Sequence, residues 1–165
     1  MNIIVAVDEN WGIGFNGDLL MRIPEDMAMF QKITSGKVVV MGRCTFNSLP
    51  HGKPLKNRIN VVLSKDSDMA IEGAAVCHSL PDLLKLCGMY ASDDIYIIGG
   101  QAVYEQLLPY CTTAYVTKLW PSPGRADRFF PNLDEEPDWS LAEQSKTQSY
   151  NEFSYAFLKY VNTKV

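Results

Sequence analysis

Short apolar runs of strand length alternate along this chain with segments of helical periodicity, and this alternation constrains the fold more than any other feature. Residues 38–41 and 95–98 are the clearest runs, because apolar and β-branched side chains follow one another there without a charged interruption. Strands of this kind are buried on both faces, as in parallel sheets whose connections are helices. The pattern therefore predicts an α/β fold with a largely parallel central sheet and helices on both faces.

The same pattern places the individual elements. Strands are predicted at residues 2–8, 37–41, 58–63, 94–98 and 112–119, and helices at residues 25–34, 43–49, 79–87 and 101–108. Two extended runs near the carboxyl end, residues 139–145 and 153–160, predict an antiparallel C-terminal hairpin at a sheet edge. We find no repeat, low-complexity tract or linker, so residues 1–165 are expected to form a single domain.

Composition excludes several classes of protein. The net charge is −4 and no basic run is present, which argues against nucleic-acid binding. No apolar stretch reaches transmembrane length, and the apolar start of the chain is too short for a signal peptide. Four scattered cysteines and two histidines lack the spacing of a metal or redox site. We therefore expect a cytoplasmic protein without a metal. The oligomeric state stays open, and a monomer is the expectation.

Asp26 is the residue most suggestive of chemistry. At helical spacing it shares a stripe with Met29, Phe30 and Ile33. A carboxylate is costly to bury because its charged form loses water, so such a group is usually paired, capping a helix or exchanging protons. The preceding Pro24 marks a helix start, where an acid also favours the helix dipole. Position alone leaves the capping and proton-exchange interpretations open.

One glycine motif is misleading. Residues 12–17 match the G-x-G-x-x-G dinucleotide fingerprint, but that fingerprint requires a helix to begin at the motif. Here the next helix start is Pro24, and the acid expected about twenty residues further on is missing. This segment is interpreted instead as a mobile flap before the helix of Asp26.

Two other glycine sites fit phosphate binding better. Gly42 follows the run at residues 38–41, and Gly99 and Gly100 follow the run at residues 95–98, each just before a predicted helix. Glycine allows a phosphate to approach the backbone, and Arg43 and Thr45 add donors at the first site. Either turn could use glycine for steric reasons only, but two in one α/β domain suit a dinucleotide.

The chain resembles a known family, the bacterial type of dihydrofolate reductase, over essentially all of its 165 residues. The motifs that carry the likeness are Val7-Asp8, Gly12-Ile13-Gly14, Ile23-Pro24-Glu25-Asp26 with Phe30, Met41-Gly42-Arg43-x-Thr45, Pro54-Leu55 with Arg58, Leu63-Ser64, Ile98-Gly99-Gly100-Gln101-x-x-Tyr104, Tyr115-x-Thr117, and Asp127 with Phe129-Phe130-Pro131.

The resemblance implies reduction of 7,8-dihydrofolate to tetrahydrofolate, with NADPH as hydride donor and antifolates as inhibitors. It implies that the hydride goes to pterin C6 and that N5 gains a proton. Asp26 would bond the pterin amino group and ring nitrogen and favour that protonation. The chemistry needs an apolar pocket that holds the two rings together and excludes water.

The resemblance also implies a substrate site. Arg58 would hold the glutamate carboxylate of folate, and Thr117 would bond Asp26 or a nearby water. The implied substrate residues are Ile4, Ala6, Leu19, Asp26, Phe30, Leu49, Leu55, Arg58, Ile98 and Thr117. Without the resemblance, the apolar members would be interpreted as ordinary core, Arg58 as a solvated charge and Thr117 as a simple strand residue.

The implied cofactor site is larger. Arg43, Ser64 and Lys65 would favour NADPH over NADH through the 2′-phosphate, and Asp127 would hydrogen-bond the flap at residues 14–19. The implied cofactor residues are Ala6, Ile13, Gly14, Asp18, Leu19, Gly42, Arg43, Cys44, Thr45, Leu63, Ser64, Lys65, His78, Ile98, Gly99, Gly100, Gln101, Ala102, Val103 and Tyr104.

Three positions depart from the family pattern. Met21 stands where the family commonly has a tryptophan that helps to hold an active-site water. Cys44 replaces a histidine or lysine often found after the arginine, and Ala102 falls where some relatives have an arginine. Two other functions stay open beside dihydrofolate reduction. One is a related reductase of another pterin or a riboflavin precursor, and the other is a non-catalytic nucleotide- or pterin-binding module.

Overall fold

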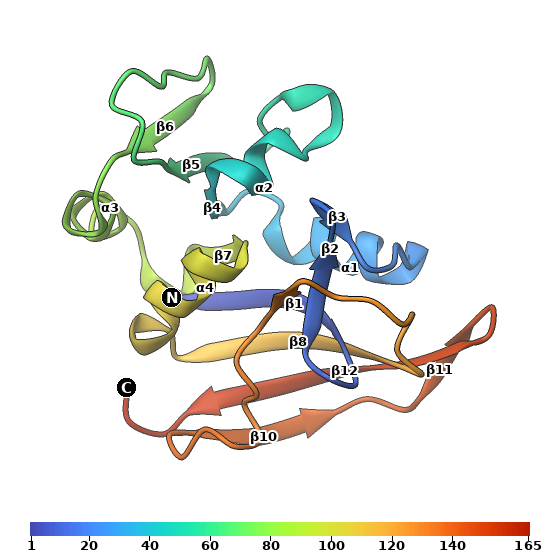
Figure 1. Ribbon diagram of the computed structural model, residues 1–165. Coiled ribbons are helices and arrows are strands. Elements are labelled where there is room, and N and C mark those ends of the chain that lie inside the picture. The colour runs from blue at the N-terminus through green and yellow to red at the C-terminus, as the bar shows by residue number, and fades with distance from the viewer.

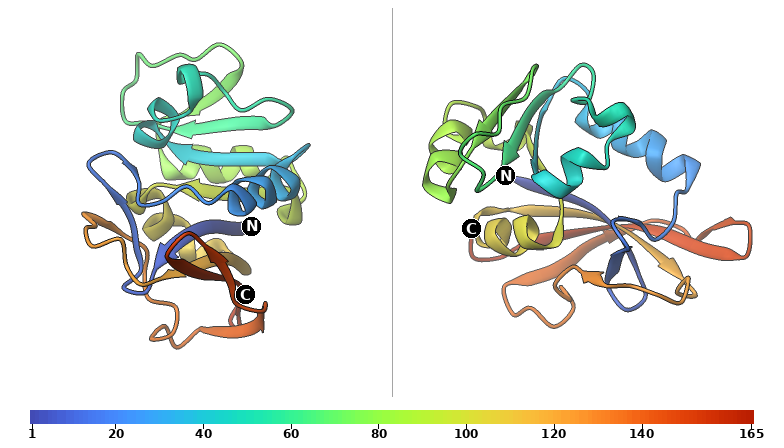
Figure 2. Two further views of the ribbon diagram at one scale, coloured as in Figure 1. Left: turned by 90° about the vertical axis from the view of Figure 1, so that its right-hand side faces the viewer. Right: turned by 45° about the horizontal axis from the view of Figure 1, so that its top comes forward.

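The computed structural model describes residues 1–165 and is built around a nine-stranded mixed sheet. Its strands are β1 (Asn2–Asp8), β4 (Val38–Gly42), β5 (Ile59–Leu63), β6 (Ala74–Cys77), β7 (Ile95–Gly99), β8 (Thr113–Trp120), β10 (Trp139–Gln144), β11 (Gln148–Tyr150) and β12 (Phe153–Asn162). The order across the sheet is β10-β12-β8-β1-β7-β4-β5-β6, with β11 paired to β12. Figure 2 shows the sheet running from β6 at one edge to β10 at the other.

The pairing confirms the predicted fold class. All five pairings among β8, β1, β7, β4, β5 and β6 are parallel. The C-terminal strand β12 is antiparallel to β8, to β10 and to β11, so the end of the chain extends the parallel sheet with an antiparallel edge. This is the edge hairpin expected from the alternating tail.

Helices cover both faces of the sheet (Figure 1). They are α1 (Pro24–Thr34), α2 (Arg43–Asn47), α3 (Leu80–Cys87) and α4 (Gln101–Leu107), with 3₁₀ turns at Pro50–Gly52, Ser92–Asp94 and Leu108–Tyr110. Along β4, Val38 and Val40 belong to the same buried cluster as residues of α3 and α4. Val39 and Met41 point to the other face, where they pack with Phe46 of α2. No helix in the structure combines the length and the apolar character needed to cross a bilayer.

Several short strands were not predicted. β6 has four residues and no strongly alternating pattern, and its strand conformation depends on parallel pairing with β5. A separate three-stranded sheet joins β2 (Gly12–Phe15), β3 (Asp18–Leu19) and β9 (Arg128–Phe129). The predicted flap is therefore a hairpin, and it is held by a strand more than a hundred residues later in the chain. No helix begins at the glycines of residues 12–17, which agrees with rejecting the dinucleotide fingerprint.

Candidate functional site

Asp26 lies in the first turn of α1 and faces the sheet. Pro24 begins the helix, and no side chain caps its amino end. The carboxylate Oδ1 of Asp26 instead accepts a hydrogen bond from Thr117 Oγ1 of β8 at 2.6 Å. The side chain is thus committed to a partner across the helix–sheet interface, and the capping interpretation does not describe it.

The surroundings of Asp26 alter its acidity. Burial raises the pKa of Asp26, and the hydrogen bond from Thr117 opposes part of that rise. None of the salt bridges in the structure involves Asp26, so no cation restores its usual acidity. A carboxyl in this state keeps its proton to higher pH than an exposed aspartate, which suits a group that assists proton transfer.

The neighbouring acid has a different partner. Glu25 is exposed and accepts a hydrogen bond from the hydroxyl of Tyr155 on β12. Burial, followed by the bond to Glu25, raises the pKa of Tyr155 to about 12. The hydroxyl therefore stays protonated and donates at physiological pH, and the start of α1 is attached to both β8 and β12.

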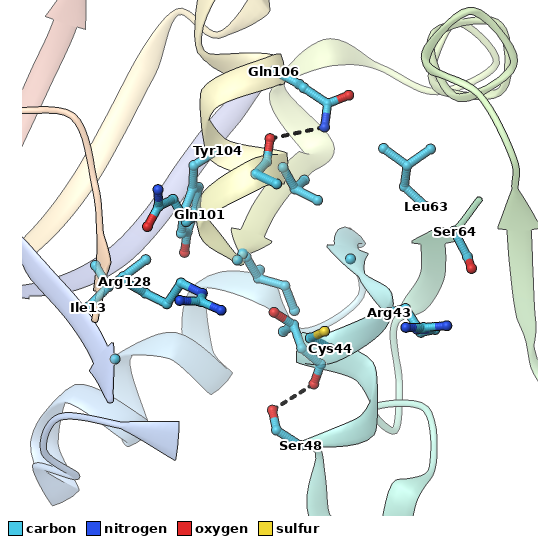
Figure 3. A pocket seen from close by; sticks show the side chains of 18 of the residues that line it. Ile13, Arg43, Cys44, Ser48, Leu63, Ser64, Gln101, Tyr104, Gln106 and Arg128 are labelled. Carbon is cyan, nitrogen blue, oxygen red and sulfur yellow. Dashed lines mark hydrogen bonds between the residues drawn. The ribbon is translucent and has the colours of Figure 1, made fainter. Parts of the chain in front are cut away.

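A cavity of about 700 Å³ lies beside the carboxyl ends of the central strands (Figure 3). All twenty residues expected to hold the cofactor line it, although they come from strands, helices and loops between residues 6 and 104. Lining residues that sequence reasoning did not include are Val5, Phe15, Gly17, Ser48, Asp66, Ser79, Leu80, Gln106 and Arg128. Most of these adjoin predicted residues in sequence, whereas Gln106 and Arg128 had no local signal.

The two glycine turns meet in this cavity. A Cβ atom on Gly42 would lie 3.0 Å from Val103 Cγ2, and one on Gly99 would lie 3.4 Å from Thr45 Oγ1. Gly99 also has a φ of +124°, in the region that disfavours L side chains. Larger residues would therefore fill or distort the cradle between β4 and β7. A glycine-lined cradle with Arg43 and Lys65 on its wall suits the phosphates of a dinucleotide, so the residues present fit NADPH.

The residues expected to bind substrate fall into three groups. Ala6, Leu19 and Ile98 line the large cavity. Ile4, Asp26 and Thr117 line a second cavity of about 350 Å³, whose other lining residues come mainly from α1, β8 and β12. Phe30, Leu49, Leu55 and Arg58 line neither of these two cavities.

The third group consists of two pairs, one near α2 and one against α1. Leu49 and Leu55 pack on the buried cluster that contains Phe46. The guanidinium of Arg58 lies 5.9 Å from the centre of the Phe30 ring, and its Nη1 donates to Thr34 Oγ1 at 3.1 Å. Arg58 is thus held against α1 with part of its guanidinium free for another acceptor.

The flap is fastened by Asp127, as predicted. The amide of Asn16 donates to Asp127 Oδ2 at 3.0 Å, and the amide of Asp127 donates to the Gly14 carbonyl oxygen at 2.9 Å. Elsewhere, all four cysteines are free thiols, with Cys44 exposed at the cavity and the other three buried. No group of three or more His, Cys, Asp or Glu side chains is arranged to hold a metal ion.

Comparison with known proteins shows the family to which the chain belongs. Residues 1–162 match the family model described as dihydrofolate reductase. The dihydrofolate reductase of Bacillus subtilis is 39% identical over 162 residues, covering 97% of this chain and 93% of the relative. That of Staphylococcus aureus is 36% identical over 166 residues and covers 99% of both chains. The solved dihydrofolate reductase of Enterococcus faecalis, complexed with NADP(H) and RAB-propyl, has a TM-score of 0.86 at 28% identity, over 98% of this chain and 95% of that one.

Proposed function

Because the chain belongs to the dihydrofolate reductase family, we propose that its Asp26 orients the pterin and favours proton delivery in the reaction of that family. The protein catalyses the NADPH-dependent reduction of 7,8-dihydrofolate to tetrahydrofolate. When bound, NADPH supplies the hydride that is added to C6 of the pterin. The residues of the chain must then bind the two rings, exclude water and favour the proton on N5.

The environment of Asp26 is the observation that carries this proposal. Its carboxyl is largely removed from water, Thr117 fixes its Oδ1 at 2.6 Å, and burial raises its pKa. A fixed carboxyl with a free second oxygen suits a pterin that presents an amino group and a ring nitrogen side by side. Because the carboxyl of Asp26 holds its proton more readily than an exposed one, the carboxyl and the bound pterin together keep a proton to higher pH.

The cofactor residues are assigned by their place in the cavity. We propose that Gly42 to Thr45 and Gly99 to Tyr104 surround the pyrophosphate and the nicotinamide half, because the two glycine turns leave backbone exposed there. Arg43, Ser64 and Lys65 would contact the 2′-phosphate. His78 accompanies them, with its Nδ1 lying 3.0 Å from the carbonyl oxygen of Ser64.

The substrate tail is assigned to the residues of the two pairs beside α1 and α2. Arg58 would pair with the glutamate carboxylate of folate while Phe30, Leu49 and Leu55 contact the aromatic body. The hairpin of residues 12–19, fastened by Asp127, would cover the reacting rings and keep water out. This combination of an aromatic body and an anionic tail favours folate over a riboflavin precursor.

The remaining assignments are proposals of the same kind. We expect one domain, a monomer in solution, a cytoplasmic location and inhibition by antifolates. The four free thiols support a reducing compartment.

The direct experiment follows NADPH absorbance with dihydrofolate, and separately with folate, other pterins and a riboflavin precursor. Rapid oxidation with dihydrofolate alone is expected. Oxidation only with one of the other substrates would assign the site to a related reductase, and oxidation with none would leave a binding module.

Asp26→Asn tests the role of the carboxyl. We expect hydride transfer near neutral pH to fall by roughly 100-fold, which is typical for loss of a group that assists proton transfer, while NADPH affinity changes little. The wild-type rate should decline as pH rises through the raised pKa of Asp26, and that step should be missing in the variant. Asp82→Asn is the matched control, since Asp82 is the third residue of α3 as Asp26 is of α1. Full activity in Asp26→Asn would reject the assignment.

A further inference from the structure

Arg128 is a cation in the cofactor cavity to which the preceding assignments give no role. It lies on β9, far in sequence from every other basic residue of the cavity wall. Figure 3 shows its guanidinium pointing into the cavity beside Ile13, on the side opposite Arg43. Arg128 would therefore contact a different part of a bound molecule from Arg43.

The backbone of Arg128 is held from two directions. Arg128 is the register partner of Gly14 in the small sheet, so its strand pairs directly with the flap. The amide of Phe129 donates to Gln101 Oε1 at 2.8 Å, and Gln101 is the first residue of α4, next to the Gly99–Gly100 turn. One short strand thus connects the flap to the glycine turn and presents a cation between them.

The guanidinium has no acidic partner. Its one hydrogen bond in the structure runs from Nη1 to the carbonyl oxygen of Asp127 at 3.0 Å, and no salt bridge includes it. Asp18, the acid that lines the same side of the cavity, is paired with Arg22 at 2.9 Å. Most of the donors of Arg128 are therefore free for an anion, and a guanidinium binds phosphate oxygens in a bidentate manner.

The residues that follow Arg43 and the second glycine turn add no cation to the cradle between the two turns. Cys44 and Ala102, which follow Arg43 and the second glycine turn, are both neutral. Arg43 and Lys65 belong to the wall formed by α2 and the end of β5, so Arg128 is the basic residue on the flap side.

We propose that Arg128 binds the pyrophosphate of the cofactor and that, through β9, this contact stabilises the flap in its paired state. The inference rests on the proposed cofactor site and adds a positioning residue to it. An anion bound to Arg128 would hold β9 in place, and β9 pairs with Gly14 of the flap. Flap pairing and cofactor affinity should therefore increase together.

The test measures equilibrium binding of NADPH and NADH, without substrate, by quenching of tryptophan fluorescence. Arg128→Ala should weaken both cofactors by a similar factor, roughly tenfold, because both carry the pyrophosphate. Cofactor binding to the Arg128→Ala variant should also depend less on salt concentration than cofactor binding to the wild type. Arg43→Ala should weaken NADPH selectively. Arg128→Lys should recover part of the loss. Lys85→Ala is the control, since Lys85 is an exposed cation on α3 that forms no salt bridge and does not line the cavity.

Hydrogen exchange of the Asn16 amide, which bonds to Asp127, reports on the flap. Cofactor should slow this exchange in the wild type and much less in Arg128→Ala. Unchanged affinity in Arg128→Ala, or a loss confined to NADPH, would overturn the assignment to the pyrophosphate. If the wild type oxidises NADPH with dihydrofolate while Arg128→Ala binds it normally, only this inference fails. A wild type that binds no NADPH would remove the proposed cofactor site as well.

Discussion

Adjacent acids at the start of α1 have opposite environments. Asp26 is turned toward the sheet, where burial raises its pKa, and Glu25 is exposed and bonded to Tyr155. Pairs of carboxyls in contrasting environments can carry different roles on one element. Here one carboxyl is suited to proton exchange and the other attaches the helix that carries it.

The raised pKa of Asp26 also predicts a cost in stability. Above that pKa the folded protein must hold a poorly solvated charge, whereas the unfolded chain holds a solvated one. Stability therefore falls as pH rises through the raised pKa. Asp26→Asn removes the charge but keeps an acceptor for Thr117, so it should be more stable at neutral pH by on the order of 1 kcal/mol, or about 2–4 °C in Tm.

Thermal unfolding over a range of pH checks this prediction. The advantage of Asp26→Asn should disappear in acid, where the wild-type carboxyl is protonated in both states. The contrary result, a variant less stable than the wild type at neutral pH, would mean that the contact with Thr117 outweighs desolvation.

At the scale of elements, α1 depends on β12 for its orientation. The buried ring of Tyr155 packs with Ile23 and Leu119, and its hydroxyl reaches Glu25. Tyr155→Phe should keep the packing and lose one hydrogen bond to an exposed acid, a cost of roughly 0.5–1.5 kcal/mol. Because the first turn of α1 also carries Asp26, the pH profile of hydride transfer should shift as well.

Tyr150→Phe is the control for this variant, because Tyr150 packs on the same cluster without a side-chain hydrogen bond. Urea unfolding gives the stability, and single-turnover rates against pH give the profile. A stability loss with an unchanged profile would show that Tyr155 supports the fold only and does not position Asp26.

The limits of sequence reasoning are clear at this scale. The runs at β4 and β7 could be predicted because burial on both faces leaves a local apolar signature. The flap sheet could not, since Asn16 and Asp127 are 111 residues apart and strands β3 and β9 have two exposed residues each. For the same reason Arg128 has the sequence signature of a solvated loop charge. Its direction into the cavity is set by pairing with Gly14, which no local pattern records.

The candidate site divides in the same way. Asp26 could be selected as a candidate from the sequence because a carboxylate on an apolar stripe is unusual, but its hydrogen-bond partner Thr117 is 91 residues away. The glycine turns could be predicted from strand–glycine–helix patterns. The resemblance to a family supplied most of the other lining residues, which come from separate strands, helices and loops, but it did not include Gln106 or Arg128.

At the scale of the whole molecule, the cofactor cavity exists only when the chain is folded. Its wall combines the ends of β1, β4, β5 and β7 with the flap, so the unfolded chain offers no comparable site. A ligand that binds only the folded state stabilises it by mass action. NADPH present at 100 times its Kd should therefore add about 2.7 kcal/mol, or roughly 5–10 °C in Tm for a chain of this length.

The gain in Tm from a bound cofactor can also test the role of a single residue of the cavity wall. If Arg43 contacts the 2′-phosphate, the wild type should gain more in Tm from NADPH than from NADH at equal concentration. Arg43→Ala should then reduce the gain from NADPH to near that from NADH while leaving the protein without ligand unchanged, since Arg43 is exposed and unpaired. Thermal scans over a series of cofactor concentrations measure both gains. Equal gains from the two cofactors in the wild type would exclude Arg43 as the residue that selects the phosphorylated form.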